Sequence, residues 1–281
     1  MKTVCLENGS RSLVAKALPD YGGLVSELVF DGIPILHFDA SMIGVSNILA
    51  GGVPILFPFL SWTEGDRYCW QGRHYTMPFH GLVKAGQFGV AEQRDDRATL
   101  YIEASEVNMK ENYPFDFRLD VTYALREGAA DFVASVTNRS GEGMPHYFGW
   151  HPWFADGDRA GVRIRTMMGK YFEYSDKVVR DVARTPDLHK KADYVFFEKY
   201  GNETVVESES DGYRVRMETD DSFDVLLVNT AQENAIVVEP WLGLPNSINT
   251  GEYVKFVPPG ERRDYRMTMH FERIGDLGGN G

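Results

Sequence analysis

Large apolar residues alternate with polar ones along much of the chain. Every second residue is apolar in the segments 117–125, 213–217 and 265–271, and charged, small or polar residues lie between them. Successive side chains of a strand point to opposite faces of its sheet, so this alternation predicts strands that are buried on one face. The 3.6-residue period of an amphipathic helix is almost absent.

Two short runs are apolar at every position. Residues 225–228 read Val-Leu-Leu-Val, and residues 235–238 read Ala-Ile-Val-Val. Runs of this kind are typical of central strands that are covered on both faces.

Residue pairs that favour tight turns separate several of these segments. Asp31-Gly32 lies between residues 24–29 and 33–38, Glu127-Gly128 follows the first alternating segment, and Asp211-Gly212 precedes the second. Such pairs adopt the positive φ angles of hairpin turns. The sequence therefore predicts an all-β protein in which sequential hairpins close into a large two-layer sandwich. We expect a single domain over residues 1–281, with a frayed Gly-rich tail at residues 274–281.

Composition and charge narrow the classes of partner. With 281 residues, 43% hydrophobic and 25% charged, the chain can build one large core. A formal net charge of −12 would repel a polyanion, so we expect no nucleic-acid partner, whereas a neutral ligand is unaffected. No run of 18 apolar residues predicts a membrane span, and the first residues lack the apolar segment of a secretory signal. We therefore expect a cytoplasmic protein.

Two cysteines, Cys5 and Cys69, are too few and too far apart for a metal knuckle. A disulfide between them is unnecessary in a core of this size. We expect buried free thiols.

Three regions interrupt the strand pattern with His, Trp, Gly and Pro. They are residues 51–58 together with 77–84, residues 146–154, and residues 238–243. Loops on a rigid sheet commonly carry catalytic and binding residues, so we expect the functional site in these regions.

His151 and Glu239 are the candidate acid–base pair. An imidazole titrates near neutral pH and can give a proton to an oxygen. Glu239 ends an apolar strand, where partial desolvation raises the pKa of a carboxyl group towards a range useful for a base. The alternatives are a structural His151 bonded to a backbone carbonyl and a Glu239 paired with an arginine. A zinc site that adds His80 and His146 lacks paired ligand spacing, so we predict no metal.

The same regions resemble the aldose 1-epimerase (galactose mutarotase) superfamily, most closely its branch of LacX-like proteins and hexose-6-phosphate 1-epimerases. Residues 51–58 are similar to the family's GG-P-LFP signature, residues 78–81 to its HGF segment, and residues 149–154 to its HPYF segment. Residues 239–241 resemble its EPW motif, and residues 259–261 its PGE motif. Five motifs in the right order cover about residues 20–272.

The resemblance implies a galactose mutarotase-like β-supersandwich that interconverts the α and β anomers of a free aldose without a cofactor. It implies that His151 is the general acid, Glu239 the general base, His80 a ligand of substrate oxygens and Asp193 a ligand of sugar hydroxyls. Four aromatic residues can offer flat faces to a pyranose or simply pack the core: Trp62, Tyr68, Trp70 and Trp153. Of these, Trp153 is the candidate substrate-binding residue.

One departure bears on the substrate. The family often has an arginine where this chain has Lys84, and a lysine cannot reproduce the two-pronged contact of a guanidinium. Arg67, Arg73 and Lys84 can form a phosphate pocket, which would make the protein a hexose-6-phosphate 1-epimerase, or can be solvated loop charges. A carbohydrate-binding protein without turnover is the third alternative. The expected partner in each case is a small sugar, and the sequence indicates no oligomeric state.

Overall fold

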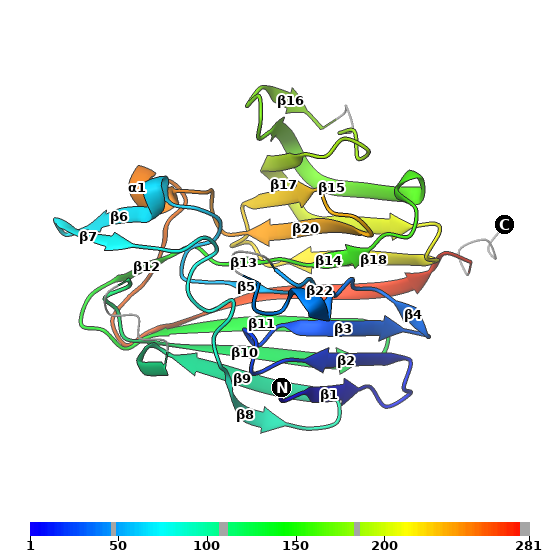
Figure 1. Ribbon diagram of the computed structural model, residues 1–281, viewed down its shortest axis with the longest axis horizontal. Helices are drawn as coiled ribbons and strands as arrows, with labels where there is room; N and C mark the ends of the chain where they lie inside the picture. Colours follow the sequence, from blue (N-terminus) through cyan, green and yellow to red (C-terminus); the bar gives the residue numbers. More distant parts are fainter. Residues whose placement is uncertain (46–48, 107–111, 183–185, 276–281) are drawn as a thin grey trace.

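The computed structural model describes residues 1–45, 49–106, 112–182 and 186–275, which fold mainly into β-strands (Figure 1). Fourteen of the described strands form one large sheet: β5 (Ile55–Leu56), β8 (Gly89–Gln93), β9 (Arg97–Glu103), β10 (Phe117–Arg126), β11 (Ala129–Asn138), β13 (Gly149–Trp150), β14 (Trp153–Ala155), β15 (Val162–Glu173), β16 (Val179–Asp181), β17 (Asp193–Ser208), β18 (Tyr213–Thr219), β19 (Val225–Asn229), β20 (Ala235–Trp241) and β22 (Arg262–Arg273).

The remaining described elements are short. A four-stranded sheet contains β1 (Val4–Glu7), β2 (Leu13–Ala17), β3 (Val25–Phe30) and β4 (Ile33–Pro34). Two-stranded sheets pair β6 (Arg67–Trp70) with β7 (Arg73–Thr76) and β12 (Met144–His146) with β21 (Lys255–Val257). The helices are the 3-10 turns η1 (Ala40–Met42), η2 (Glu64–Asp66), η3 (Ala104–Glu106) and η5 (Arg159–Gly161), and the α-helix α1 (Ser247–Thr250).

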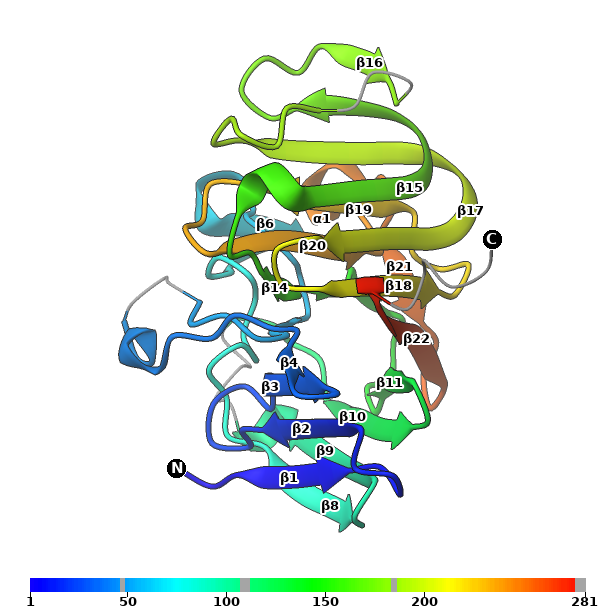
Figure 2. The ribbon, with the colours of Figure 1, turned by 90° about the vertical axis from the view of Figure 1, so that its right-hand side faces the viewer.

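Two layers enclose the core at one end of the molecule. The strand order of the large sheet runs β5-β13-β20-β19-β17-β18-β22-β11-β10-β9-β8. The small sheet covers its β8–β10 end, as Figure 2 shows, and β1 contacts both β9 and β10. Val4 and Leu13 of the small sheet and Leu100 and Leu119 of the large one belong to a single buried cluster. The alternating pattern supplies one apolar face to this cluster from each layer.

The structure confirms the strands predicted from both kinds of pattern. The alternating segments lie in β10, β18 and β22, where buried and more exposed residues alternate. The two fully apolar runs lie in the neighbouring strands β19 and β20, and every residue of β20 is buried. The turn between β3 and β4 has the expected positive φ at Asp31 (48°) and Gly32 (81°).

Two local predictions are corrected. Only Ile33 and Pro34 of the segment 33–38 pair with β3, since the chain then leaves this sheet and Leu36 bridges to Phe154 instead. No strand was predicted between residues 58 and 77, where the structure contains the β6–β7 hairpin with its turn at Gln71-Gly72.

The prediction of buried thiols is wrong, because Cys5 and Cys69 are both exposed and free. In β1 and β6 the neighbouring residues Val4 and Tyr68 point inwards, so strand alternation turns each cysteine outwards. The predicted tail lies, from residue 276 onwards, outside the described residues. Among the described helices, none has the length and apolarity needed to cross a membrane.

Candidate active site

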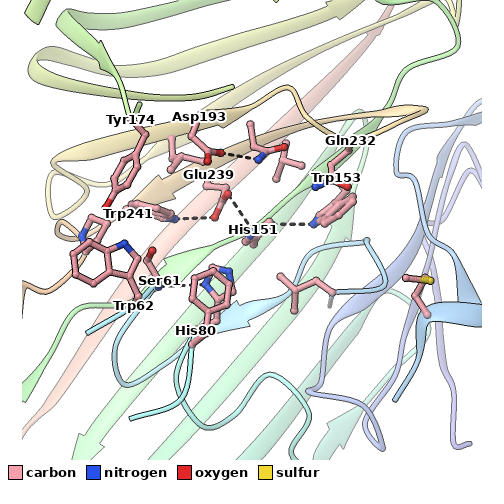
Figure 3. A pocket seen from close by; sticks show the side chains of 17 residues that line it. Ser61, Trp62, His80, His151, Trp153, Tyr174, Asp193, Gln232, Glu239 and Trp241 are labelled. Carbon is pink, nitrogen blue, oxygen red and sulfur yellow. Dashed lines mark hydrogen bonds and ion pairs between the residues drawn. The ribbon is translucent and has the colours of Figure 1, made fainter. Parts of the chain in front are cut away.

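A cavity of about 510 Å³ opens beside strands β17, β19 and β20 of the large sheet (Figure 3). Strands β17, β19 and β20 supply one wall, with Asp193, Asn229 and Glu239 among its residues. The opposite wall comes from the loops around Trp62 and His80. Segments far apart in the sequence therefore meet at this cavity.

Glu239 lies on β20 directly opposite Leu227 of β19, and it is only 2% exposed. Burial raises the pKa of its carboxyl group well above the ordinary range, while a hydrogen bond from Trp241 works in the other direction. The indole Nε1 of Trp241 donates to Oε2 of Glu239 at 2.9 Å. A desolvated carboxylate held in this way is a competent proton acceptor near neutral pH.

His151 lies in the short link between β13 and β14, and its backbone N–H donates to the Pro54 carbonyl oxygen at 3.1 Å. Its Nε2 is 3.2 Å from Oε1 of Glu239. On the other side of the ring, Nε1 of Trp153 donates to Nδ1 at 2.9 Å. Burial lowers the pKa of His151 to about 3, so the ring is neutral at physiological pH.

These contacts determine which nitrogen of His151 carries the proton. The indole N–H of Trp153 can only donate, so Nδ1 must be an acceptor and the neutral ring carries its proton on Nε2. This nitrogen is the one that lies near Oε1 of Glu239. Of the two carboxylate oxygens of Glu239, Oε2 accepts from the Trp241 N–H, and Oε1 lies 3.2 Å from Nε2 of His151.

His80 faces the same pair. Its ring lies edge-on to that of His151, with 5.2 Å between ring centroids. The backbone N–H of Ser61 donates to Nδ1 of His80 at 3.2 Å, so the neutral ring keeps a proton on Nε2. Burial and the neighbouring His151 lower the pKa of His80 well below its usual value. His80 thus lines the cavity as a neutral ring with an N–H donor.

The backbone around His80 is tightly fitted. His80 itself has a positive φ of 64°, and Gly81 follows with 78°. A Cβ atom at position 81 would lie 2.3 Å from the backbone oxygen of Phe57. Only glycine fits there, so the Gly after His80 determines where the imidazole enters the cavity.

Asp193 begins β17 and pairs in register with Asn229 at the end of β19. Nδ2 of Asn229 donates to Oδ1 of Asp193 at 2.6 Å. The bond orients the carboxylate at the cavity wall, where its second oxygen is available to a hydroxyl group.

The structure brings together the five proposed catalytic and sugar-binding residues, whereas the three proposed phosphate-binding cations lie elsewhere. His80, His151, Trp153, Asp193 and Glu239 all line the cavity. Arg67 and Lys84 do not, and neither does Arg73 on the exposed edge of β7.

Two of these three cations, Arg67 and Lys84, differ in their surroundings. The side chain of Arg67 is exposed on β6. Nζ of Lys84 donates to the backbone oxygen of Phe79 at 2.5 Å and lies over the Phe79 ring, 5.6 Å from its centroid. Burial lowers the pKa of Lys84.

Of the remaining candidates from the sequence, one lines the cavity and three pack against other side chains of the protein. Trp62 lines the cavity, whereas Tyr68 packs edge-on against Phe59 and Trp70 packs against Phe115. His146 is fully buried, and its Nε2 lies 2.6 Å from the Tyr265 hydroxyl.

Several lining residues escaped the sequence analysis. They are Ser61, Tyr174, Leu227, Asn229, Gln232 and Trp241. Trp241 could have been predicted to line the site, because residues 239 and 241 lie on the same face of one strand. Trp153 follows His151 at the same spacing. Asn229 and Gln232 come into place only through strand pairing.

The lining chemistry suits a neutral polar ligand. Asp193 and Glu239 are its acidic members, and no Lys or Arg of the described residues lines it. Among the described residues, no group of three or more His, Cys, Asp or Glu side chains is arranged to hold a metal ion.

Fold and site together define a class: an all-β protein whose large sheet holds an enclosed carboxyl–imidazole pair in a small-molecule cavity. Residues 3–270 match the aldose 1-epimerase family. The chain belongs to this family, and it has the galactose mutarotase-like fold predicted from its motifs.

Individual proteins are similar to this chain in sequence or in fold. The chromosomal LacX protein of Lactococcus lactis subsp. lactis is 26% identical over 239 residues, covering 74% of this chain and 79% of LacX. The crystal structure of the Slr1438 protein from Synechocystis sp. PCC 6803 is 23% identical, with a TM-score of 0.91 over 97% of this chain and 96% of that chain. A galactose mutarotase related enzyme from Lactobacillus acidophilus is 17% identical, with a TM-score of 0.80 over 97% and 98% of the two chains.

Proposed function

We propose that the protein is an aldose 1-epimerase that interconverts the α and β anomers of a neutral aldose. The observation that carries the proposal is the pair formed by Glu239 and His151, 3.2 Å apart in a cavity of about 510 Å³. One group accepts a proton and the other offers one, which is what the opening of a hemiacetal ring requires.

In the proposed reaction, Glu239 takes the proton of the C1 hydroxyl group. The C1–O1 bond becomes a carbonyl, the bond between C1 and the ring oxygen breaks, and Nε2 of His151 gives its proton to that oxygen. Rotation about C1–C2 presents the other face of the aldehyde. The ring oxygen then returns its proton to His151 and attacks C1, and Glu239 gives its proton to O1. No proton is consumed overall.

His151 acts here as a neutral acid. A neutral imidazole can protonate or polarise an oxygen when a donor at its second nitrogen stabilises the charge that develops on the ring. The indole N–H of Trp153 is such a donor. His80 and Asp193 are the proposed ligands of the substrate hydroxyl groups, and Trp153 forms part of the wall against which the sugar ring lies.

The absence of Lys and Arg from the described lining favours a neutral aldose over a hexose 6-phosphate. A phosphate group in this cavity would face Asp193 and Glu239 without a balancing cation. Arg67 and Lys84, which would have supplied the charge, lie outside it.

Polarimetry of freshly dissolved single anomers tests the proposal. The protein should speed the approach to anomeric equilibrium of glucose or galactose above the uncatalysed rate, and should act more slowly on glucose 6-phosphate. A faster reaction with the phosphate would identify a hexose-6-phosphate 1-epimerase. Heat of binding without acceleration of any sugar would identify a carbohydrate-binding protein and refute turnover.

A further inference from the structure

A second cavity, of about 470 Å³, adjoins the candidate active site. The two cavities share Met42, Leu49, Trp153 and Gln232, so they form one continuous cleft. Each volume lies within the ~300–1,000 Å³ typical of small-molecule sites. The cleft therefore has room for a ligand larger than the single sugar ring that the acid–base pair needs.

Aromatic rings connect the reacting pair to the second cavity. The ring of Trp153 lies nearly parallel to that of His151, at 5.8 Å and 20°, and nearly parallel to that of His37, at 6.4 Å and 23°. His37 lines only the second cavity. The indole of Trp153 thus lies between the candidate acid–base pair and the second cavity.

Polar groups surround the second cavity, and their charges nearly cancel. Lys191 is its one described cation, and Nζ lies 3.6 Å from the carboxylate of Glu233, which also lines it. Asp39 adds a further negative charge. An anionic substituent would find no unpaired cation, whereas a neutral group rich in hydroxyls can bond to carboxylate, amide and ammonium groups alike.

Residues 231–234, which form one side of the second cavity, belong to a loop that is held by hydrogen bonds from Arg159 and Asp156. Arg159 donates hydrogen bonds to the backbone oxygens of Thr230 at 3.1 Å, Gln232 at 3.1 Å and Ala235 at 2.7 Å. The backbone N–H of Asp156 donates to the Asn234 oxygen at 3.1 Å. The space is consequently preformed, which reduces the entropy lost when a ligand binds.

We propose that this second cavity is a subsite for a second sugar ring and that the preferred substrate is a neutral reducing disaccharide. The reducing ring lies between Glu239 and His151, and the glycosyl ring passes Trp153 into the space lined by His37, Ala231 and Lys191. This inference rests on the proposed epimerase function, which it refines.

Four disaccharides that end in the same reducing glucose but differ in linkage or outer sugar provide the test: maltose, cellobiose, lactose and melibiose. At least one should have a kcat/KM about tenfold above that of glucose in polarimetry, which corresponds to ~1.4 kcal/mol of added binding. Ala231→Trp, which fills only the second cavity, should remove this advantage and leave the kcat/KM of glucose within about twofold. Ala91→Trp, at an exposed position of the distant strand β8, is the matched control.

The subsite is refuted if no disaccharide exceeds glucose, or if Ala231→Trp slows both substrates equally. Preference for glucose 6-phosphate over every disaccharide would also overturn it. Failure of the epimerase proposal looks different, because then glucose is not accelerated either. If Ala231→Trp does not fold, Glu233→Trp places an indole at the same cavity from an exposed position and gives the same comparison.

Discussion

Replacing Trp153 by Phe tests how His151 works. The substitution keeps an aromatic ring and removes the N–H that donates to Nδ1 of His151 at 2.9 Å. When Nε2 gives its proton to the ring oxygen, the imidazole gains negative charge and this bond becomes charge-assisted. Hydrogen bonds to charged groups contribute ~1.5–3 kcal/mol. At about 1.4 kcal/mol per tenfold, kcat should fall between about tenfold and a hundredfold.

The opposite mechanism predicts the opposite result. If His151 worked as a doubly protonated imidazolium, the Trp153 N–H would face an N–H on Nδ1 and oppose the active form. Removing it would then raise kcat below pH 6.5, the ordinary pKa of the ring. The lowered pKa of His151, about 3, argues for the neutral acid.

The assay is polarimetric turnover of a monosaccharide from pH 4 to pH 9, with KM measured separately. Trp62→Phe is the matched control, because Trp62 also lines the cavity but makes no contact with His151 that the structure records. It should change KM more than kcat. A Trp153→Phe variant whose kcat stays within about twofold, or rises at acidic pH, would refute the neutral-acid mechanism.

Three further predictions concern the pH dependence of activity and the stability of the fold. Trp241→Phe removes a donor that favours the charged form of Glu239, so its pKa should rise and the acidic limb of the kcat/KM profile should move to higher pH. The buried His146 has a folded-state pKa of about 4 against 6.5 unfolded, so its contribution is complete above pH 6.5 and is lost as pH falls towards 4. Urea unfolding at pH 7 and pH 4 should show that His146→Asn removes about 3 kcal/mol of this pH dependence. Gly81→Ala should destabilise the fold by ~2 kcal/mol or more in the same assay, whereas Gly72→Ala, at a similar positive φ with free space for a Cβ, should cost ~1 kcal/mol.

Much of the fold follows from local pattern. Period-two alternation predicted β10, β18 and β22, and the uninterrupted apolar runs predicted the central strands β19 and β20. The long strands β15 and β17 gave weaker signals, because their buried and partly buried residues do not alternate regularly. The bulge in their pairing between Thr166 and Met168 breaks the period further.

The site was predictable where its chemistry is local. Glu239 and His151 stand out because each is a titratable residue in an apolar setting, and Trp241 shares a strand face with Glu239. The cavity positions of Asn229 and Gln232 depend on pairing across the sheet, which a single sequence does not specify. Arg67 was a candidate by charge alone, and Lys84 by its charge and its place in the motif that follows His80. The ammonium group of Lys84 donates to a backbone oxygen instead, and the side chain of Arg67 is exposed to solvent.

The most direct test of the acid–base account is anomeric exchange of ¹³C-labelled glucose and galactose, followed by magnetisation-transfer NMR at pH 7. The unmodified protein should speed α–β exchange, and Glu239→Gln should reduce the rate constant by about two to four orders of magnitude. Glu261→Gln, at an exposed turn, should leave it unchanged. Exchange that is equally fast with Glu239→Gln, or no faster with the unmodified protein than in buffer, would contradict the account.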